Sequence, residues 1–286
     1  AALNMYGKCH TVGKAREIFD AMDDRDVIAW NAMMASYVHC EEFPQACSFF
    51  KRMMSDKSGM KPNNITFANV LVATAEQLAF DEGQIIHAHI IKGGIEQDLL
   101  VGNSLINMYS KCGNVGRARI VFNKLSKRDV VSWNALLVGY GQHGKGKQAL
   151  HLLQEMLMHG IAPNEVTFLS ILSSCNHSGL VDEASQCFAS MEKVYCVRPF
   201  AEHYNVLVDL LGRVGRLEDA QEIIKEMPLD PVASTWMGLL GACRKHRDLK
   251  RGIESASHVF SIDPLYNAAF VTLSNLQIEC ETTVHE

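Results

Sequence analysis

Blocks of sequence that recur at a fixed offset constrain the fold of this chain more than any other feature. The three tryptophans, Trp30, Trp133 and Trp236, are separated by 103 residues each time. The block RDVIAWNA that begins at Arg25 recurs as RDVVSWNA at Arg128, which is again an offset of 103 residues. Self-similarity of this kind is the signature of proteins built from stacked repeats.

The long repeat divides into shorter units of 31 to 37 residues. The complete units are 27–63, 64–98, 99–129, 130–164, 165–200 and 201–232. A partial unit, 1–26, precedes them, a divergent unit, 233–266, follows them, and residues 267–286 form a last partial segment.

Each unit predicts two helices. In the unit 130–164, apolar residues at a spacing of three or four positions occur on both sides of Gly144, which marks a turn, and Gly160 and Pro163 end the second helix. A unit of two helices cannot bury its apolar face alone, so neighbouring units must stack. The sequence therefore predicts an all-α solenoid with a groove.

The composition excludes several classes of protein. Lys and Arg number 27 against 32 Asp and Glu, a formal charge of −5, so bulk positive charge does not drive binding. Hydrophobic residues make up 48% of the chain, which argues against disorder, and no apolar run reaches the length of a membrane span. The nine cysteines contain no C-x-x-C pair and indicate a reducing compartment. The chain opens at Ala1, and we expect it to lack the N-terminus of a longer protein.

Three recurring blocks carry a resemblance to a known family. They are W-N-A at Trp30–Ala32, M-Y-x-K-C at Met108–Cys112 and P-N-x-x-T-F at Pro163–Phe168. With the alternation of unit lengths, they resemble plant pentatricopeptide-repeat proteins of the P-L-S subclass. This resemblance implies a right-handed α-solenoid of about eight helix-turn-helix repeats.

The resemblance also assigns a type to each unit. Units 27–63 and 130–164 resemble P-type repeats, 64–98 and 165–200 resemble L-type repeats, and 1–26, 99–129 and 201–232 resemble S-type repeats. Residues 233–266, with the segment Trp236–Arg244, resemble the extension (E) motif that follows the last repeat in this family. Residues 267–286 resemble the start of a second E motif up to Asn275, followed by a divergent tail.

By the same resemblance, the fifth and last residues of a repeat read one base of single-stranded RNA. The pairs are Asn31 with Asn63, Asn103 with Asp129, Asn134 with Asn164, and Asn205 with Val232. An amide carries a donor and an acceptor, which suits a pyrimidine edge. A single Asn early in a helix is usually a cap, but its recurrence at one repeat position favours RNA contact.

The family associates Asn–Asp with U and Asn–Asn with C, U being tolerated. Val232 departs from the expected polar residue, so Asn205 predicts only a weak pyrimidine preference. The L-type pairs, Ala68 with Asp98 and Leu169 with Phe200, match no readable pair.

Two further sets of residues follow from the repeat positions. The second residue of five units is aliphatic, and in the family these residues sandwich bases; interhelix core is the alternative interpretation. They are Ile28, Ile65, Leu100, Val131 and Val166. Lys8, Lys111 and Arg213 share one offset in the S-type units and resemble phosphate-contacting residues.

Catalytic motifs are sparse. His39-Cys40-Glu41 matches H-x-E, the start of a deaminase zinc site, but the required P-C-x-x-C does not occur, so chance is the better interpretation. His87 and His89 have no ligand partner at metal spacing. We expect no catalytic residue, cofactor or metal in this chain.

The predicted function is sequence-specific binding of single-stranded RNA that specifies C-to-U editing sites in mitochondrial or chloroplast transcripts. A deaminase would come from a C-terminal domain or a partner protein, which would bind through the E motif, and no membrane is involved. Two alternatives stay open: stabilisation or splicing of organellar RNA without editing, and a protein-binding scaffold of tetratricopeptide type.

Overall fold

The computed structural model describes residues 2–9, 11–56, 60–228 and 230–282, with the side chains of Ala2, Asn4, Lys8 and Thr282 set aside. Within these residues the chain forms α-helices, labelled α1 to α17, and no β-strand. The helices belong to two compact units, Ala1–Gln142 and His143–Glu286. The all-helical fold predicted from the sequence is thereby confirmed.

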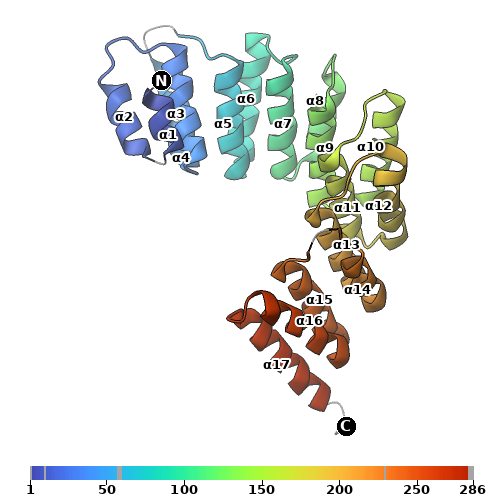
Figure 1. Ribbon diagram of the computed structural model, residues 1–286. Coiled ribbons are helices and arrows are strands. Elements are labelled where there is room, and N and C mark those ends of the chain that lie inside the picture. The colour runs from blue at the N-terminus through green and yellow to red at the C-terminus, as the bar shows by residue number, and fades with distance from the viewer. Residues whose placement is uncertain (1, 10, 57–59, 229, 283–286) are drawn as a thin grey trace. The chain divides into compact units, whose positions relative to one another are not determined.

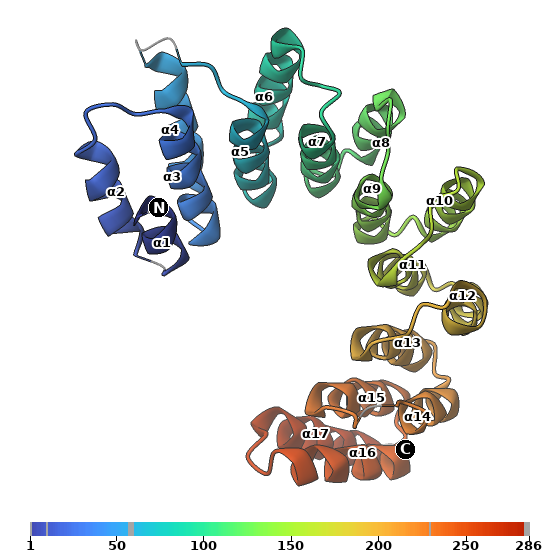
Figure 2. The same cartoon turned by 45° about the horizontal axis from the view of Figure 1, so that its top comes forward.

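The first unit contains nine helices among its described residues (Figure 1). They are α1 (Ala2–Lys8), α2 (Val12–Asp20), α3 (Val27–His39), α4 (Phe43–Ser55), α5 (Asn64–Glu76), α6 (Phe80–Gly93), α7 (Leu99–Lys111), α8 (Val115–Lys124) and α9 (Val130–Gln142). Helices α1, α3, α5, α7 and α9 pack side by side in one layer. The other helices form a second layer, in which each packs on its own hairpin partner and on the first helix of the next hairpin (Figure 2).

The second unit repeats this arrangement. Its helices are α10 (Gly146–Met158), α11 (Glu165–Ser178), α12 (Val181–Tyr195), α13 (Ala201–Arg213), α14 (Leu217–Lys225), α15 (Ala233–His246), α16 (Leu249–Ile262) and α17 (Asn267–Thr282). Helices α11, α13, α15 and α17 pack in sequence as one layer, and α10, α12, α14 and α16 pack against it. Each unit is thus a stack of helical hairpins.

The last residue of a predicted repeat caps the first helix of the next repeat. The side chains of Asp26, Asn63, Asp98 and Asn164 each accept a hydrogen bond from the backbone N–H three residues on, at the N-termini of α3, α5, α7 and α11. A cap of this kind stabilises a helix by about 1 kcal/mol. These caps explain why the first helices begin at 27, 64, 99 and 165, the predicted first residues of the repeats.

The recurring tryptophans lie in the core between adjacent helices. Trp30 on α3 is fully buried, and its ring lies 4.9 Å from that of Phe19 on α2 and 4.7 Å from that of Phe49 on α4. Trp133 on α9 meets Phe122 of α8 at 4.7 Å. The 103-residue spacing therefore places one large aromatic side chain at the same place in every third hairpin.

The helix at the C-terminal end extends further than the sequence resemblance does. Helix α17 continues past Asn275 to Thr282, Leu276 on it is fully buried, and Glu279 pairs with Arg244 of α15 at 2.7 Å. The part of the expected tail from residue 276 to residue 282 is therefore packed helix; residues 283–286 lie outside the described residues.

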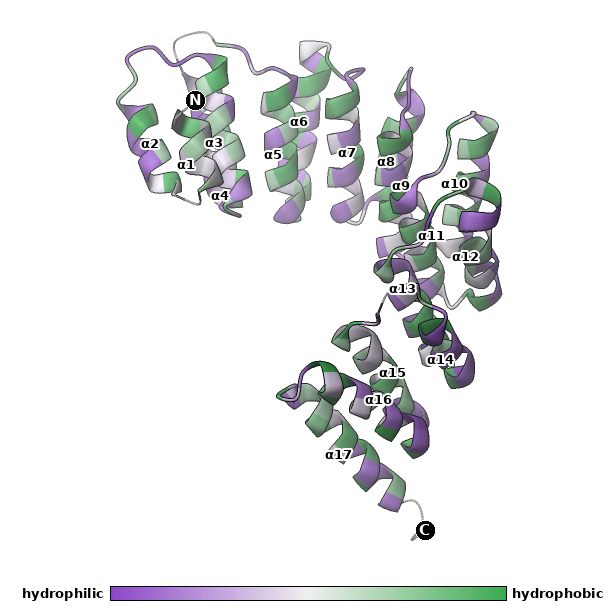
Figure 3. Cartoon of the chain, in the orientation of Figure 1, coloured by the Kyte–Doolittle hydropathy of each residue, from purple (hydrophilic) through white to green (hydrophobic). Residues whose placement is uncertain are grey.

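Polar residues occur among the apolar residues along the helices. Figure 3 shows hydrophobic and hydrophilic residues mixed along the helices rather than separated into apolar and polar ones. None of the helices in the described part of the chain combines the length and the apolar character needed to cross a membrane.

Candidate nucleic-acid interface

The second residues of the first helices form an exposed aliphatic row. Ile28, Ile65, Leu100 and Val131 lie at the same position of α3, α5, α7 and α9, which pack side by side, and Val166 occupies that position of α11. Between 48% and 70% of each of these residues is exposed. The alternative interpretation as interhelix core is therefore wrong. Their role in sandwiching bases stays a prediction, and exposure is what that role requires.

Asn31 and Asn63 are brought together by the packing of α3 on α5. Asn31 Nδ2 donates to Asn63 Oδ1 at 3.0 Å, and Thr66 Oγ1 donates to Asn31 Oδ1 at 2.7 Å. Thr66 also accepts from the Asn63 backbone N–H at 3.1 Å, completing a capping box. Asn31 is 7% exposed, so this amide is held in one orientation.

Asn103 and Asp129 form a looser pair between α7 and α9. Asn103 Nδ2 lies 3.5 Å from Asp129 Oδ1, at the limit of a hydrogen bond, and Asn103 Oδ1 is buried with no partner in the described residues. Asp129 Oδ1 also accepts from the N–H and the hydroxyl of Ser132, at 2.9 and 3.0 Å. Burial tends to raise the pKa of Asp129, but these hydrogen bonds outweigh it and lower that pKa below its usual value.

The remaining predicted reading residues occupy comparable places. Asn134 is 7% exposed on α9. Asn164 caps α11 through a capping box with Thr167. On α13, Asn205 Oδ1 accepts from Thr235 Oγ1 of α15 at 2.7 Å, and Val232, at the end of that repeat, is 51% exposed.

Sequence reasoning missed a polar contact in the first L-type unit. Asn64, at the start of α5, donates to Asp98 Oδ2 at 3.0 Å, whereas Ala68, the expected partner, is buried in the core. Asp98 also caps α7. In the second L-type unit, Leu169 and Phe200 offer no polar side-chain atom. The sequence feature that could have indicated this contact is the position of Asn64, which directly follows the Asn63 cap and lies one helical turn before Ala68.

The predicted phosphate contacts are already paired where the structure describes them. Lys111 Nζ lies 2.5 Å from Glu76 Oε1, and Arg213 lies 2.9 Å from Asp209. The side chain of Lys8, at the end of α1, is outside the described residues. Lys245 shares their repeat offset, was missed, and donates to the backbone carbonyl of Arg213 at 3.1 Å. Phosphate binding at these positions must therefore compete with carboxylates and carbonyls.

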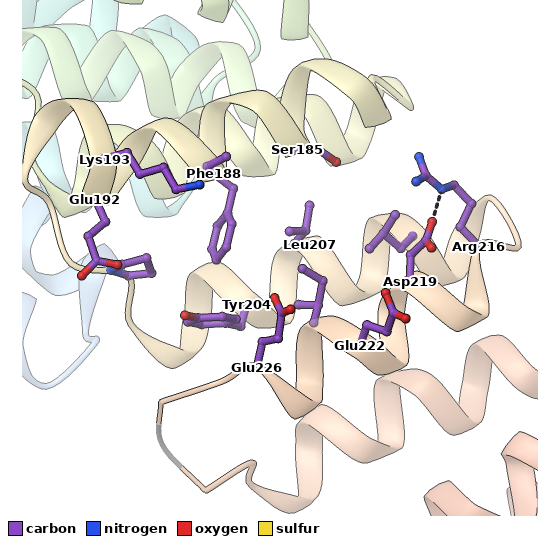
Figure 4. A pocket seen from close by; sticks show the side chains of 14 residues that line it. Ser185, Phe188, Glu192, Lys193, Tyr204, Leu207, Arg216, Asp219, Glu222 and Glu226 are labelled. Carbon is purple, nitrogen blue, oxygen red and sulfur yellow. Dashed lines mark hydrogen bonds and ion pairs between the residues drawn. The ribbon is translucent and has the colours of Figure 1, made fainter.

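A separate cleft lies between α12, α13 and α14, with a volume of about 460 Å³. Figure 4 shows Phe188, Tyr204 and Leu207 projecting into it, with Glu192 and Glu226 beside Tyr204. Burial and these two carboxylates raise the pKa of Tyr204. Four carboxylates and two basic residues, Lys193 and Arg216, line the cleft, so it is acidic on balance and unsuited to RNA.

The His, Cys and Glu residues considered above for catalysis or metal binding lie in a turn between helices or within a helix. His39-Cys40-Glu41 spans the turn between α3 and α4. His87 Nδ1 lies 2.8 Å from the Tyr109 hydroxyl, which confirms a satisfied helix histidine, and burial lowers its pKa. Across the described residues, no three His, Cys, Asp or Glu side chains gather in a way that could hold a metal ion.

Comparison with family models matches several parts of the chain to one kind of repeat. The model described as "PPR repeat" matches residues 28–58, 103–130, 166–196 and 202–231, and the model described as "PPR repeat family" matches residues 128–177. Together they cover more than half of the chain. The chain belongs to the pentatricopeptide-repeat family.

Curated relatives of the chain are pentatricopeptide repeat-containing proteins of Arabidopsis thaliana. A chloroplastic one is 37% identical over 284 residues, covering 96% of this chain and 32% of that protein. A mitochondrial one is 37% identical over 274 residues, covering 96% of this chain and 49% of that protein. The chain thus spans a third to a half of these relatives, and their organelles confirm the expected location in a mitochondrion or chloroplast.

Solved structures share the fold. The pentatricopeptide repeat protein PPR10 from maize is similar with a TM-score of 0.63 at 19% identity, covering 96% of this chain and 45% of PPR10. PPR10 in complex with an 18-nt psaJ RNA element is similar with a TM-score of 0.53 at 16% identity, covering 96% of this chain and 49% of PPR10. These similarities confirm the solenoid fold.

Proposed function

We propose that the chain binds single-stranded RNA along the first helices of its hairpins, one base per repeat. The exposed aliphatic row carries this proposal: it offers apolar side chains against which bases can pack, next to amide pairs that can meet a base edge. The complex of PPR10 with an RNA element gives a precedent on a similar fold.

The expected target runs 5′ to 3′ in parallel with the chain. From the repeat 27–63 onward, its bases are a pyrimidine, any base, U, a pyrimidine, any base and a weakly preferred pyrimidine. Amide and carboxylate side chains then provide the specificity, which suits a chain of net charge −5.

Fluorescence anisotropy with this RNA and a scrambled RNA tests the proposal. Leu100→Ser and Val131→Ser should each weaken binding about tenfold, because burying the exposed part of an aliphatic side chain against a base contributes about 1–2 kcal/mol. Ile120→Ser is the matched control, since Ile120 is 56% exposed on the second helix α8. Equal affinity for both RNAs, or an equal loss in the control, would refute the proposed surface.

We also propose that RNA binding by this chain specifies C-to-U editing. The P-L-S alternation and the resemblance of 233–266 to an E motif support this role, and α15 and α16 form a hairpin there. The deaminase would be supplied by other residues of a longer protein or by a partner that binds the E motif; this chain itself would not be an enzyme. Sequencing organellar transcripts from a knockout plant tests this: loss of one edit supports the role, whereas unspliced or depleted transcripts with intact editing favour RNA stabilisation or splicing.

A second candidate is a protein-binding scaffold, and the acidic cleft of α12–α14 is the observation that favours it. A cleft lined by the aromatic rings of Phe188 and Tyr204 and by several carboxylates suits a basic peptide. RNA binding that is indifferent to base sequence, together with binding of basic peptides that Glu192→Gln weakens, would favour this function over the first.

A further inference from the structure

We propose that a hydroxyl group at the third residue of a repeat, where it donates to the Asn at the fifth residue of the preceding repeat, makes that Asn favour C over U. This inference rests on the proposed RNA binding and extends it to a positioning residue outside the reading pair. The residues concerned are Thr66, Ser132 and Thr235, whose hydroxyl groups lie beside Asn31, Asp129 and Asn205 respectively.

The Thr66 hydroxyl donates a hydrogen bond to the side-chain oxygen of Asn31, so this oxygen already has a donor. A hydroxyl has one hydrogen to donate, and Thr66 accepts from the Asn63 N–H while donating to Asn31 Oδ1 at 2.7 Å, with Asn63 Oδ1 a more distant acceptor at 3.0 Å. Asn63 Oδ1 itself already accepts from Asn31 Nδ2 and from the Thr66 N–H. Both amide oxygens of this pair are therefore engaged, and the pair can offer mainly N–H groups to a base.

Ser132 leaves the corresponding oxygen of Asn103 uncommitted. Its hydroxyl donates to Asp129 Oδ1 at 3.0 Å, since a carboxylate is a stronger acceptor than an amide. Asn103 Oδ1 is then buried without a partner in the described structure, and only the 3.5 Å contact to Asp129 holds the amide. An unsatisfied buried acceptor is unfavourable, so a small rotation that lets this oxygen accept from a ligand is favoured.

The two states match the two pyrimidines. Uracil carries an N–H donor at N3, and a free Asn oxygen can accept from it. Cytosine carries an unprotonated N3 acceptor, which N–H groups can meet. The last residue of a repeat thus influences the fifth residue of the same repeat indirectly. The two compete as acceptors for the hydroxyl group at the third residue of the next repeat.

The last readable repeat extends the rule. Val232 has no side-chain acceptor, so Thr235 donates to Asn205 Oδ1 at 2.7 Å, as Thr66 does to Asn31. We therefore expect Asn205 to favour C over U, a sharper expectation than a weak pyrimidine preference.

Base discrimination in three variants tests the inference. Each protein is titrated with RNAs that carry C or U only at the nucleotide facing the varied repeat. Thr66→Val should reduce the preference for C over U at the Asn31 nucleotide about tenfold, the effect of one hydrogen bond. Thr66→Ser, which keeps the hydroxyl, should retain the preference. Thr74→Val is the matched control: it removes a buried hydroxyl of the same helix α5 that donates to the Val70 carbonyl instead, so the preference at the Asn31 nucleotide should stay unchanged.

The outcomes separate the inference from the proposed function. If wild-type protein does not distinguish matched from scrambled RNA, the proposed function fails and the inference fails with it. If wild-type protein prefers C at the Asn31 nucleotide and Thr66→Val weakens C and U equally, RNA binding stands and the hydroxyl is only a cap. Thermal unfolding monitors each variant; should Thr66→Val not fold, Thr235→Val in the second unit must reduce the preference for C at the Asn205 nucleotide, or the inference is wrong.

Discussion

Individual side chains in this protein cap a helix and contact a second predicted reading residue at once. Asn63 caps α5 and also accepts from Asn31, the fifth residue of its own repeat. Asp129 binds the N–H and hydroxyl of Ser132 and lies within reach of Asn103. We therefore expect a substitution at such a cap to change helix stability and the proposed base contact together, and only variants of the fifth residue separate the two.

Asn103→Thr should change the base read by its repeat from U to G. The family associates a Thr–Asp pair with G, and a hydroxyl can serve a purine edge where the amide served a pyrimidine. Discrimination should shift by roughly 1–3 kcal/mol, the size of one good base contact. The measurement is a titration of both proteins with RNAs that differ only by U or G at that nucleotide. An equal loss on both RNAs would show that Asn103 supports the helix and reads nothing.

Asp129→Ala should destabilise the protein by an amount that depends on pH. The folded state lowers the pKa of Asp129, so its contribution is present above the ordinary Asp pKa of about 3.9 and is lost as the pH falls through the folded value. We expect a loss of about 1 kcal/mol at pH 7, typical of a missing helix cap. Urea unfolding of both proteins at pH 7 and near pH 3 measures it. A difference that stays constant with pH would contradict the assigned ionisation.

At the scale of helices, the sequence predicted most of what the structure contains. Recurring blocks and apolar residues at helical spacing located the first helices, and the Asp and Asn caps in the structure explain where those helices begin. Helix α17 was not predicted beyond Asn275, because the packing of Leu276 near Gly252 depends on a neighbour that lies 24 residues away.

The site was less predictable than the helices. The exposure of Ile28 could not be read from its type, since an aliphatic residue in a first helix suits both core and surface. The pairing of Lys111 with Glu76 was readable in principle, because both occupy the same position of adjacent repeats. The sequence could not show which oxygen accepts from the Thr66 hydroxyl, because the side chains of Asn31 and Asn63 both lie within reach.

The close approach of α13 to α15 should make Gly212 intolerant of a side chain. A Cβ atom at Gly212 would lie 2.6 Å from Ala242 Cβ, well inside van der Waals contact. Gly212→Ala should destabilise the protein by about 1–3 kcal/mol through overpacking. Gly241→Ala is the control, since a Cβ added at Gly241 would have nothing within 4 Å, and this variant should stabilise α15 by about 0.5–1 kcal/mol. Thermal unfolding of both variants measures these changes in stability. Equal effects of the two substitutions would mean that α13 and α15 can move apart at Gly212 without loss of stability.

Over the whole molecule, charge limits how strongly the proposed RNA ligand can be held through its phosphates. The chain carries a net charge of −5, and the described phosphate candidates, Lys111 and Arg213, already face Glu76 and Asp209. Binding should therefore depend weakly on salt. With Lys8 as the third cation, and a slope of about −0.7 per phosphate for single strands, the logarithm of affinity should fall with the logarithm of salt at a slope of roughly −2.

Anisotropy titrations between low and physiological salt measure this slope for the matched RNA. Lys111→Gln should make it shallower by about 0.7. A slope of about −6 or steeper in the wild-type protein would mean that basic residues other than these three dominate binding.

The contact of Thr66 with Asn31 has a consequence for building chimeric proteins. Each proposed reading site starts at the fifth residue of one repeat and finishes at the third residue of the next, as at Asn31 to Thr66 and Asn103 to Ser132. A recombination junction at the repeat boundary therefore inherits half of a site from each parent, and the recipient's hydroxyl would govern the donor's Asn. Junctions at the fourth residue, such as Trp30, Phe67 or Trp133, fall between consecutive sites. Modules exchanged at those points should transfer their base preference intact.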